Sequence, residues 1–479
     1  MKKNLLHYFL IVSFVVSSFS FAGAAYDKNL NPGSRGEAVL ELQNFLRDRG
    51  YLKATPNGLY GQATTAAVKA LQKNNGLSQV GVLGPQTRAA IKNFLAESSS
   101  NSNSNSNSNS NNTSNNSTST DKKDYTLSSN IQNILNKKFT VGAWVPYWQE
   151  ENGSKQIVEN INKVDIISPF SYEMNDTGTF SDPMKLASGP YADMIKVAKA
   201  NGKLVVPSIL WWASGYERDN LDVIMKDDYL RGYLIDLILA EVKKHDLDGI
   251  DIDFENKKAE TRDDFSKFLE ELASDLHDKN KMLICTIEAR TPSSTEFMNG
   301  TADQDKLARS NDFKRIGQAC DQVRIMAYDQ DRADKDLNNL KGSEYKPVAD
   351  IDWVKKVLTL AMRDIPWNKI SLGVPTYGYK YEIKRDANNN ITSYSRLGSM
   401  NWYYADQEVK DKGLVTKRDS TGELSYTYYD QAKGKEYMTV YSDAEAIKQK
   451  NDLAKIYGIG GITIFKIDGN NDKSVWSKI

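Results

Sequence analysis

Histidine is scarce in this sequence, which limits the chemistry available to the protein. Only three histidines occur among 479 residues, and one of them, His7, lies in an apolar N-terminal run. The other two, His245 and His277, are too few for a histidine-rich zinc site, and neither lies in a nucleophile motif. We therefore expect no bound metal ion and no cofactor.

Cysteine is rarer still, since the chain contains only Cys285 and Cys320. Each lies in or just before a segment with the pattern of a buried strand. Spacing alone does not establish that two such residues meet in the fold. We expect two buried free thiols, with a disulfide as the alternative.

The chain also lacks net charge, because 62 Lys and Arg residues balance 62 Asp and Glu residues. A protein that binds nucleic acid usually carries a positive surplus, so we expect no nucleic-acid partner. The charged residues are interpreted as solvated faces of a globular protein.

The N-terminal apolar run is short. The first 25 residues begin with two lysines, continue with an apolar run through Val16 and end with small residues at 22–25. This order is typical of a cleavable signal peptide over residues 1–25. The run is interrupted by His7 and is short for a membrane span, although an uncleaved anchor is the alternative. We predict a secreted, cell-wall-associated protein with no stable membrane insertion after cleavage.

A low-complexity segment separates two parts of the chain. Residues 98–120 consist almost entirely of serine, asparagine and threonine. Such a segment cannot bury enough apolar surface to fold. We predict a linker over residues 97–122, between a small domain at residues 29–96 and a large domain at residues 139–479.

The most informative segment is DGIDIDFE at residues 248–255. In an extended strand successive side chains point to opposite faces, so Asp251, Asp253 and Glu255 share one face and apolar residues occupy the other. Carboxylates spaced in this way repel one another, so one or more should hold a proton near neutral pH. An apolar back and an acidic front fit the wall of a (β/α)8 barrel, with Glu255 at the rim of the active site.

Two other interpretations of this segment fit less well. An EF-hand loop also alternates aspartates, but it needs a glycine at its sixth position, where counting from Asp246 places Asp251. A solvated acidic face seldom has Ile, Ile and Phe behind it unless that side is buried. We therefore interpret the segment as a group of catalytic acids.

Apolar runs alternate with helical patterns throughout the large domain, which predicts a (β/α)8 TIM barrel in the α/β class. Eight candidate strands occur, at Val141–Trp148, Asp165–Phe170, Leu204–Leu210, Gly249–Glu255, Met282–Glu288, Val323–Asp329, Ile370–Pro375 and Gly461–Ile467.

These motifs resemble those of glycoside hydrolase family 18, which includes chitinases and peptidoglycan N-acetylglucosaminidases. DGIDIDFE matches the family's D-x-x-D-x-D-x-E signature, and residues 325–329 (IMAYD) resemble its sixth strand. Residues 373–381 (GVPTYGYKY) resemble the seventh strand in the form found in the spore-cortex glucosaminidase branch. One departure is Phe465, where the family usually has a tryptophan beneath the sugar being cleaved. The resemblance also implies a small α+β insertion at about residues 381–439, between strands seven and eight.

The resemblance implies a role for each catalytic residue. Glu255 would protonate the glycosidic oxygen, while Asp253 would hold the acetamide N–H of the substrate and steady the oxazolinium ion. Asp251 would shift the charge balance of Asp253, and Tyr328 would bind the acetamide oxygen. In this family the acetamido oxygen of the sugar takes the place of the enzyme nucleophile, so the reaction is retaining and substrate-assisted. Asp248 has the opposite strand parity and is interpreted as structural.

Aromatic and polar residues near the predicted strand ends are candidate substrate contacts. By resemblance these are Met326, Asp329, Tyr377 and Phe465. Five tryptophans also lie near predicted strand ends or in the insertion: Trp144, Trp148, Trp211, Trp212 and Trp402. Aromatic faces stack on sugars, but tryptophan is also a common core residue, so both interpretations stay open for each.

The small domain contains an internal repeat. Residues 58–64 (GLYGQAT) recur as residues 81–87 (GVLGPQT), and each copy predicts a turn followed by a helix. Apolar residues at helical spacing before Gly50 predict a third helix. Together with residues 33–36 (GSRG), the repeat resembles the peptidoglycan-binding domain type 1. A helical bundle without a ligand is the alternative.

Taken together, these features predict a secreted, monomeric endo-β-N-acetylglucosaminidase that hydrolyses β-1,4 bonds after N-acetylglucosamine in peptidoglycan. The chemistry requires an N-acetyl group, which chitin also carries, so a chitinase is the enzymatic alternative. A lectin-like barrel is the alternative from another class, but such relatives usually lose the acid that Glu255 supplies.

Overall fold

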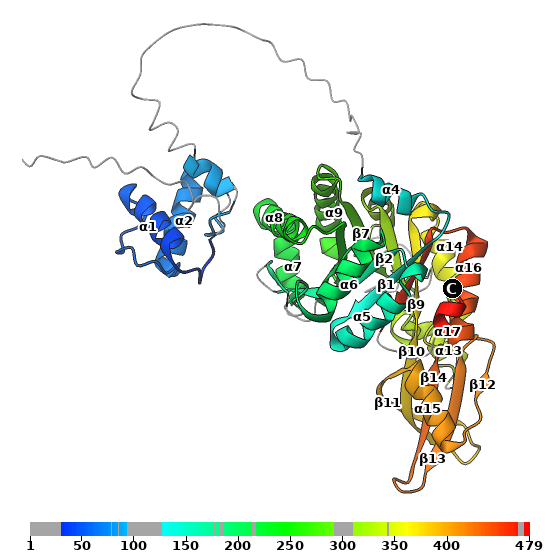
Figure 1. Ribbon diagram of the computed structural model, residues 1–479. Coiled ribbons are helices and arrows are strands. Elements are labelled where there is room, and N and C mark those ends of the chain that lie inside the picture. Colours follow the sequence, from blue (N-terminus) through cyan, green and yellow to red (C-terminus); the bar gives the residue numbers. More distant parts are fainter. Residues whose placement is uncertain are drawn as a thin grey trace, which may run out of the picture. The chain divides into compact units, whose positions relative to one another are not determined.

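The computed structural model describes residues 30–92 and 127–479, apart from residues 78, 85, 176–177, 183–184, 213–216, 292–309, 343 and 468–473. The predicted signal peptide and the predicted linker lie outside the described residues. The chain divides into two compact units, Met1–Ser117 and Thr118–Ile479 (Figure 1). Among the described residues, no helix has both the length and the apolar character needed to span a membrane.

The first unit is helical. It contains α1 (Glu37–Asp48), α2 (Gln62–Asn74) and a third helix whose described part covers residues 86–92. The apolar faces of these helices form one core, which includes Val39, Leu42, Leu46, Val68, Leu71 and Ile91. The predicted three-helix domain is confirmed.

Each copy of the repeat in this unit is held by one buried glutamine from the preceding helix. Gln43 Nε2 donates a hydrogen bond to Thr64 Oγ1 at 2.8 Å, and Gln72 Nε2 donates one to Thr87 Oγ1 at 3.0 Å. The Oε1 atom of each glutamine accepts from the backbone N–H of the first glycine of its turn. The repeat in sequence is therefore a repeat in hydrogen bonding.

The second unit is a closed barrel of parallel strands (Figure 1). The order is β1-β15-β9-β8-β7-β6-β5-β2, and β1 also pairs with β2, which closes the ring. The predicted TIM barrel is confirmed. Its strands are β1 (Thr140–Pro146), β2 (Ile166–Met174), β5 (Ser208–Trp212), β6 (Gly249–Glu255), β7 (Met282–Glu288), β8 (Gln322–Met326), β9 (Ile370–Pro375) and β15 (Gly461–Phe465).

One predicted strand is divided. β4 (Leu204–Val205) and β5 replace the single strand expected over residues 204–210. Pro207 lies between them and has no N–H for a ladder hydrogen bond. Its carbonyl oxygen still accepts from the Asp251 N–H at 2.9 Å, so this part of the chain stays against β6. A short strand, β3 (Phe180–Ser181), pairs with the end of β2.

Helices surround the barrel and connect its strands. The α-helices are α4 (Ser129–Leu135), α5 (Glu150–Glu159), α6 (Gly189–Ala200), α7 (Glu217–Lys226), α8 (Asp228–Lys244), α9 (Arg262–His277), α11 (Phe313–Ala319), α12 (Gln330–Ala333), α13 (Lys335–Lys341), α14 (Ile351–Ala361), α16 (Ala444–Tyr457) and α17 (Ser474–Ser477). Short 3-10 helices are η2 (Tyr147–Gln149), η3 (Ile161–Lys163), η4 (Ala259–Thr261) and η5 (Trp367–Lys369).

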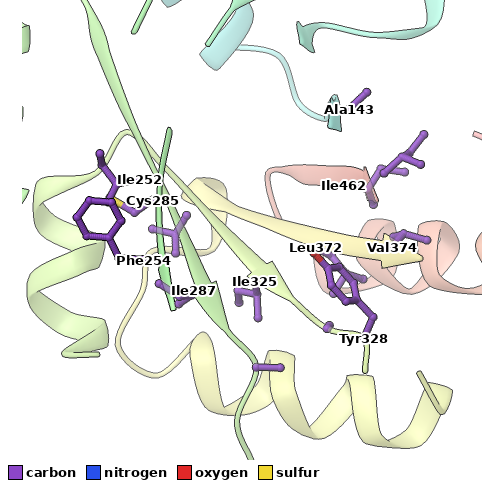
Figure 2. Packing of buried hydrophobic residues seen from close by; sticks show 14 of the residues in the cluster. Ala143, Ile252, Phe254, Cys285, Ile287, Ile325, Tyr328, Leu372, Val374 and Ile462 are labelled. Carbon is purple, nitrogen blue, oxygen red and sulfur yellow. The ribbon is translucent and has the colours of Figure 1, made fainter. Parts of the chain in front are cut away.

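The apolar face of β6 packs outward against α9. The ring of Phe254 stacks on Phe268 with centroids 6.0 Å apart, and Phe265 on the same helix lies at the same distance. Figure 2 shows Ile252 and Phe254 of β6 beside Cys285 of β7. Because side chains alternate along the strand, the carboxylates of β6 point to the inside of the barrel.

The expectation of two free thiols is wrong, because Cys285 and Cys320 form a disulfide with their Cα atoms 6.0 Å apart. The two residues are distant in sequence, but β7 and β8 are neighbouring strands, with Cys285 opposite Val323. Cys320 directly follows α11 and precedes β8. The parallel pairing therefore brings the two sulfur atoms together, which no spacing rule indicates.

A second, antiparallel sheet is inserted between β9 and β15. Its order is β11-β10-β14-β13-β12, and it projects from the barrel (Figure 1). The α+β insertion expected from the resemblance is confirmed, and its strands begin at Tyr377, directly after β9. Its elements are β10 (Tyr377–Arg385), β11 (Ile391–Asn401), α15 (Trp402–Lys412), β12 (Lys417–Arg418), β13 (Leu424–Asp430) and β14 (Lys435–Tyr441).

Candidate active site

The acidic strand β6 lies between β5 and β7. Its pairing with β5 places Ser208 opposite Asp251 and Trp212 opposite Glu255. Glu255 is the last residue of β6, so it stands at the C-terminal end of the strand, where TIM-barrel enzymes hold their active sites. Asp248, which precedes the strand, accepts a hydrogen bond from the Val205 N–H at 2.8 Å and so fastens β4.

Asp251 is the innermost of the three carboxylates, and its environment is saturated with hydrogen bonds. Its side chain is fully buried and forms an ion pair with the equally buried Arg324, at 3.0 Å from Nη1 to Oδ2. Trp144 Nε1 and Ser208 Oγ donate to the same oxygen, and Thr286 Oγ1 donates to the other at 2.8 Å. These four donors satisfy both oxygens of the Asp251 carboxylate.

Asp253 is also buried, but it has few partners. Its Oδ1 atom has no hydrogen-bond partner among the residues that the structure describes. Burial raises the pKa of Asp253 well above its ordinary value, and the negative charges of Asp251 and Glu288 raise it further against the opposing effect of Lys257. Asp253 is therefore a carboxyl group that readily holds a proton and has a free acceptor atom.

Glu255 is the partly buried residue at the strand end. Burial raises the pKa of Glu255 well above its ordinary value, and the carboxylates of Asp253, Glu288 and Asp329 add to the shift while Lys257 opposes it. The side chain therefore keeps its proton at pH values where a free glutamate has lost it. A general acid needs this property.

A second carboxylate beside Glu255 was not anticipated from the sequence. Glu288 is the last residue of β7, and the pairing of Ile252 with Cys285 places the ends of β6 and β7 side by side. The Asn256 N–H donates to Glu288 Oε1 at 2.8 Å, and Asn311 Nδ2 donates to Oε2 at 2.6 Å.

Glu288 differs from Glu255 in its ionisation. Burial alone would raise the pKa of Glu288, but the ammonium group of Lys257 and the hydrogen bonds from Asn256 and Asn311 bring it below its ordinary value. Lys257 is itself buried, and its Nζ lies 3.9 Å from Glu288 Oε2 and 4.5 Å from the ring centroid of Phe265. Glu288 ends β7 on the same strand parity as Ile284 and Thr286, and this alternation of side chains could have indicated that it faces the inside of the barrel.

The predicted residues after β8 meet those of β10 and β15. The ring of Tyr328 stacks on Phe465 with centroids 5.1 Å apart, and Tyr377 contacts both rings edge-on. Asp329 adopts a left-handed backbone conformation, with φ at 54°, and accepts a hydrogen bond from Tyr377 Oη at 2.6 Å. Met326, the last residue of β8, is partly buried against the same core.

The structure thus brings Tyr328, Asp329, Tyr377 and Phe465 together. Burial and the carboxylates of Asp253 and Glu255 raise the pKa of Tyr328, so its phenol stays protonated and can donate a hydrogen bond. Among the described residues, no group of His, Cys, Asp and Glu side chains is arranged to hold a metal ion.

The tryptophans separate into two classes. Trp144 is buried and its Nε1 donates to Asp251. Trp211 packs on Phe254, and Trp402 is buried in the insertion, where Nε1 donates to Asp406. Trp148 and Trp212 are exposed to 45% and 52% and lie just after β1 and at the end of β5. These two flat surfaces at the C-terminal ends of strands are available to a ligand.

Comparisons with known proteins agree with this architecture. The model of glycosyl hydrolases family 18 matches residues 143–470, and a peptidoglycan binding domain model matches residues 35–91. Among curated proteins, the uncharacterized glycosylase YvbX of Bacillus subtilis is 26% identical over 55% of this chain and 70% of its own length. The cortical fragment-lytic enzyme of Bacillus anthracis is 24% identical over 62% of this chain and 63% of its own length.

Solved structures share the fold. The spore cortex-lytic enzyme SleL of Bacillus cereus superposes with a TM-score of 0.57 at 22% identity, covering 71% of this chain and 73% of that one. A chitinase from Chromobacterium violaceum gives a TM-score of 0.56 at 19% identity, covering 70% of this chain and 97% of that one. Since the family model spans most of the sequence, this protein belongs to glycosyl hydrolases family 18.

Proposed function

We propose that this protein is a secreted glycosidase that hydrolyses β-1,4 bonds after N-acetylglucosamine in peptidoglycan, with retention of configuration and with assistance from the substrate. The observation that carries the proposal is the contrast between Glu255, which holds a proton, and the buried, unpartnered Oδ1 of Asp253. One group can supply a proton and the other can accept an acetamide N–H.

The proposed reaction has two steps. In the first, Glu255 gives its proton to the glycosidic oxygen while the acetamido oxygen of the same sugar attacks C1, and the bond to the leaving sugar breaks. Asp253 accepts the acetamide N–H and stabilises the oxazolinium ion, and Tyr328 Oη donates to the acetamide oxygen before attack. In the second, water attacks C1 and gives a proton to Glu255, the C1–O bond of the oxazolinium ring breaks, and the acetamide is restored.

The neighbouring residues support these roles. Asp251 forms an ion pair with Arg324, and its negative charge adds to the raised pKa of Asp253. Met326, Asp329 and Tyr377 would form the floor for the N-acetyl sugar, and Phe465 would supply its aromatic platform. The ring of Phe465 stacks on that of Tyr328, so the aromatic platform packs directly against the residue that would bind the acetamide.

Peptidoglycan is favoured over chitin because a peptidoglycan binding domain model matches the small unit and because relatives include enzymes named for cortical fragments. Chitin is the second candidate, since Chitinase A1 of Niallia circulans is 24% identical over half of this chain. The test is to digest purified peptidoglycan and chitin oligomers side by side and identify the new reducing ends by mass spectrometry. New N-acetylglucosamine ends from peptidoglycan support the proposal, and new ends from chitin alone would contradict it.

Retention and substrate assistance are tested with a soluble oligomer. Proton NMR should find the β anomer released first, and a thiazoline analogue of the cyclic intermediate should inhibit, since mimics of high-energy states bind tightly. Removal of the acetyl group should abolish cleavage after that sugar. An initial α anomer, or rapid cleavage after glucosamine, would exclude the roles of Asp253 and Tyr328.

The disulfide between Cys285 and Cys320 supports export, because disulfides persist in oxidising compartments outside the cytosol. Export agrees with the predicted signal peptide at residues 1–25. Mass spectrometry of the mature protein from the culture medium and cell wall should find a chain that begins near residue 26. Light scattering should find a monomer.

A further inference from the structure

A cationic side chain of the inserted sheet lies next to the candidate site without belonging to the predicted set. Arg396 of β11 is opposite Tyr381 of β10 in the sheet register. Its guanidinium carbon lies 3.5 Å from the centroid of the Tyr379 ring, so the planar group is stacked on the phenol. Stacking of this kind fixes the position of a long side chain before any ligand binds.

The face of the sheet that carries Arg396 is the one directed at the catalytic end of the barrel. Side chains alternate along β10, and Lys380 points to the opposite face, where it binds Glu408 of α15 at 2.7 Å. The hydroxyl group of Tyr379 donates a hydrogen bond to Asp329. Asp329 is one of the carboxylates that raise the pKa of Glu255. Arg396 is thus separated from Asp329 by one aromatic ring.

The guanidinium group has most of its hydrogen-bonding capacity free. Its one ion pair among the described residues is to Asp331, with Nη1 to Oδ2 at 3.8 Å, and it makes no hydrogen bond to another described residue. The side chain keeps 29% of its surface exposed. A guanidinium has five N–H donors in a fork that matches the two oxygens of a carboxylate.

Cationic side chains outnumber carboxylates around Arg396. Arg332, Lys346 and Arg396 all act on the carboxylate of Asp331, and Lys346 Nζ also lies 4.6 Å from the centroid of the Tyr394 ring. Asp329 is a second carboxylate that acts on Asp331. Three cations therefore lie near two carboxylates, and Asp331 Oδ1 is buried without a hydrogen-bond partner among the described residues. An incoming carboxylate would meet an excess of positive charge here.

We propose that Arg396 binds a carboxylate carried by the muramyl residue of peptidoglycan, and so helps the enzyme to distinguish peptidoglycan from chitin. The inference rests on the proposed function. Chitin is uncharged, whereas muramic acid carries a lactyl group that ends in a carboxylate or continues into a stem peptide with carboxylates of its own. Both sources present the same chemistry to the guanidinium.

The test compares three variants on three substrates. The variants are Arg396→Gln, Arg396→Lys and the control Arg363→Gln. Arg363 is an exposed residue between α14 and β9, at the N-terminal end of the strands and so at the end of the barrel opposite the candidate site. The substrates are glycan strands with stem peptides, strands from which an amidase has removed the stems, and N-acetylglucosamine oligomers. Circular dichroism and thermal unfolding check that each variant folds.

We expect Arg396→Gln to raise KM by about 10-fold on substrates with the bound carboxylate and to leave kcat and the hydrolysis of N-acetylglucosamine oligomers nearly unchanged. Arg396→Lys should retain part of the affinity because it retains the charge. A loss on amidase-treated strands identifies the lactyl carboxylate, and a loss on stem-bearing strands alone identifies the stem. Equal loss on all three substrates, or no loss on any, overturns the proposal.

Binding provides a readout that does not depend on turnover. In the Glu255→Gln background, adding Arg396→Gln should weaken calorimetric binding of a soluble muramyl-containing tetrasaccharide and not that of N-acetylglucosamine tetramer. Wild-type enzyme that cleaves peptidoglycan while Arg396→Gln cleaves it equally well would contradict only the role of Arg396. Wild-type enzyme that cleaves chitin oligomers and no peptidoglycan would contradict the proposed function, and the role of Arg396 with it.

Discussion

The interior of the barrel and its catalytic end treat buried carboxylates differently. Asp251 and Asp253 lie on the same face of β6, two residues apart, and both are buried. Asp251 is surrounded by donors that include Arg324, whereas Asp253 Oδ1 has no hydrogen-bond partner among the described residues. In the deeper layer the carboxylate of Asp251 is therefore fully hydrogen-bonded, while in the outer layer Asp253 keeps an unpaired oxygen that a substrate can use.

The largest effect should come from the outermost acid. Glu255→Gln removes the proton donor for bond cleavage, so kcat should fall by roughly 100-fold or more while glycan binding stays nearly intact. Steady-state kinetics on a soluble oligomer provide the measurement. The exposed Glu260→Gln is the matched control and should keep full activity. Near-normal turnover of Glu255→Gln would refute its assignment as the acid.

The next effect concerns stability. Arg324→Met leaves Asp251 buried without its cation, which should lower the free energy of unfolding by about 3 to 5 kcal/mol. Asp253→Asn should change it by less than about 1 kcal/mol at neutral pH, because the carboxyl group it replaces is already poorly bonded. Urea unfolding at one pH measures both. Equal losses of unfolding free energy in the two variants would contradict the proposed difference between the two layers.

The same pair should also differ in pH dependence. The pKa of Asp253 is raised in the folded state, so its favourable contribution is complete below the unfolded pKa and is lost as pH rises through the folded pKa. Asp253→Asn removes this loss and should become more stable relative to wild type as pH increases through that window. A stability difference that does not vary with pH would contradict the raised pKa.

A smaller effect should appear in the pH profile of activity. The anionic Glu288 raises the pKa of Glu255, and Lys257 lowers it. Glu288→Gln should therefore move the alkaline limb of kcat/KM to lower pH, because Glu255 then loses its proton earlier. Lys257→Met should move the limb in the opposite direction. If the alkaline limb moved in the same direction in both variants, the charges of Glu288 and Lys257 would not be the cause of the shift.

Deleting the first unit should have the smallest effect on the chemistry at the active site. Deleting residues 29–96 should slow hydrolysis of insoluble sacculi and leave turnover of a short soluble oligomer nearly unchanged, since a tethered binding module raises only the local concentration of the barrel. Rates on the two substrates provide the measurement. Equal losses on both would mean that the first unit contributes to the active site.

Local patterns made much of the fold predictable. The period-two alternation of DGIDIDFE predicted both the strand and the inward direction of its acids, because successive side chains of a strand point to opposite faces. The boundary at Pro207 was missed because the apolar run continues through it, although its missing N–H explains the division between β4 and β5.

Partners from distant segments could not be predicted. Arg324 reads as an ordinary charged residue within a strand, and only the closed barrel brings it against Asp251. Glu288 and Arg396 are likewise brought to the site by neighbouring strands and by the inserted sheet. The disulfide has the same origin, since the pairing of β7 with β8 determines which cysteines meet. These contacts depend on which strands are neighbours in the barrel, and the local sequence pattern does not indicate that order.

The Cys285–Cys320 bond also changes how the chain would respond to cutting. It closes a covalent loop that contains both Glu288 and Asn311, which are hydrogen-bonded to each other beside Glu255. A protease that cleaves one peptide bond within this loop leaves the two ends joined through sulfur. Glu288, which raises the pKa of Glu255, would then stay covalently linked to both fragments of the chain. A single cut within the loop would not release either fragment.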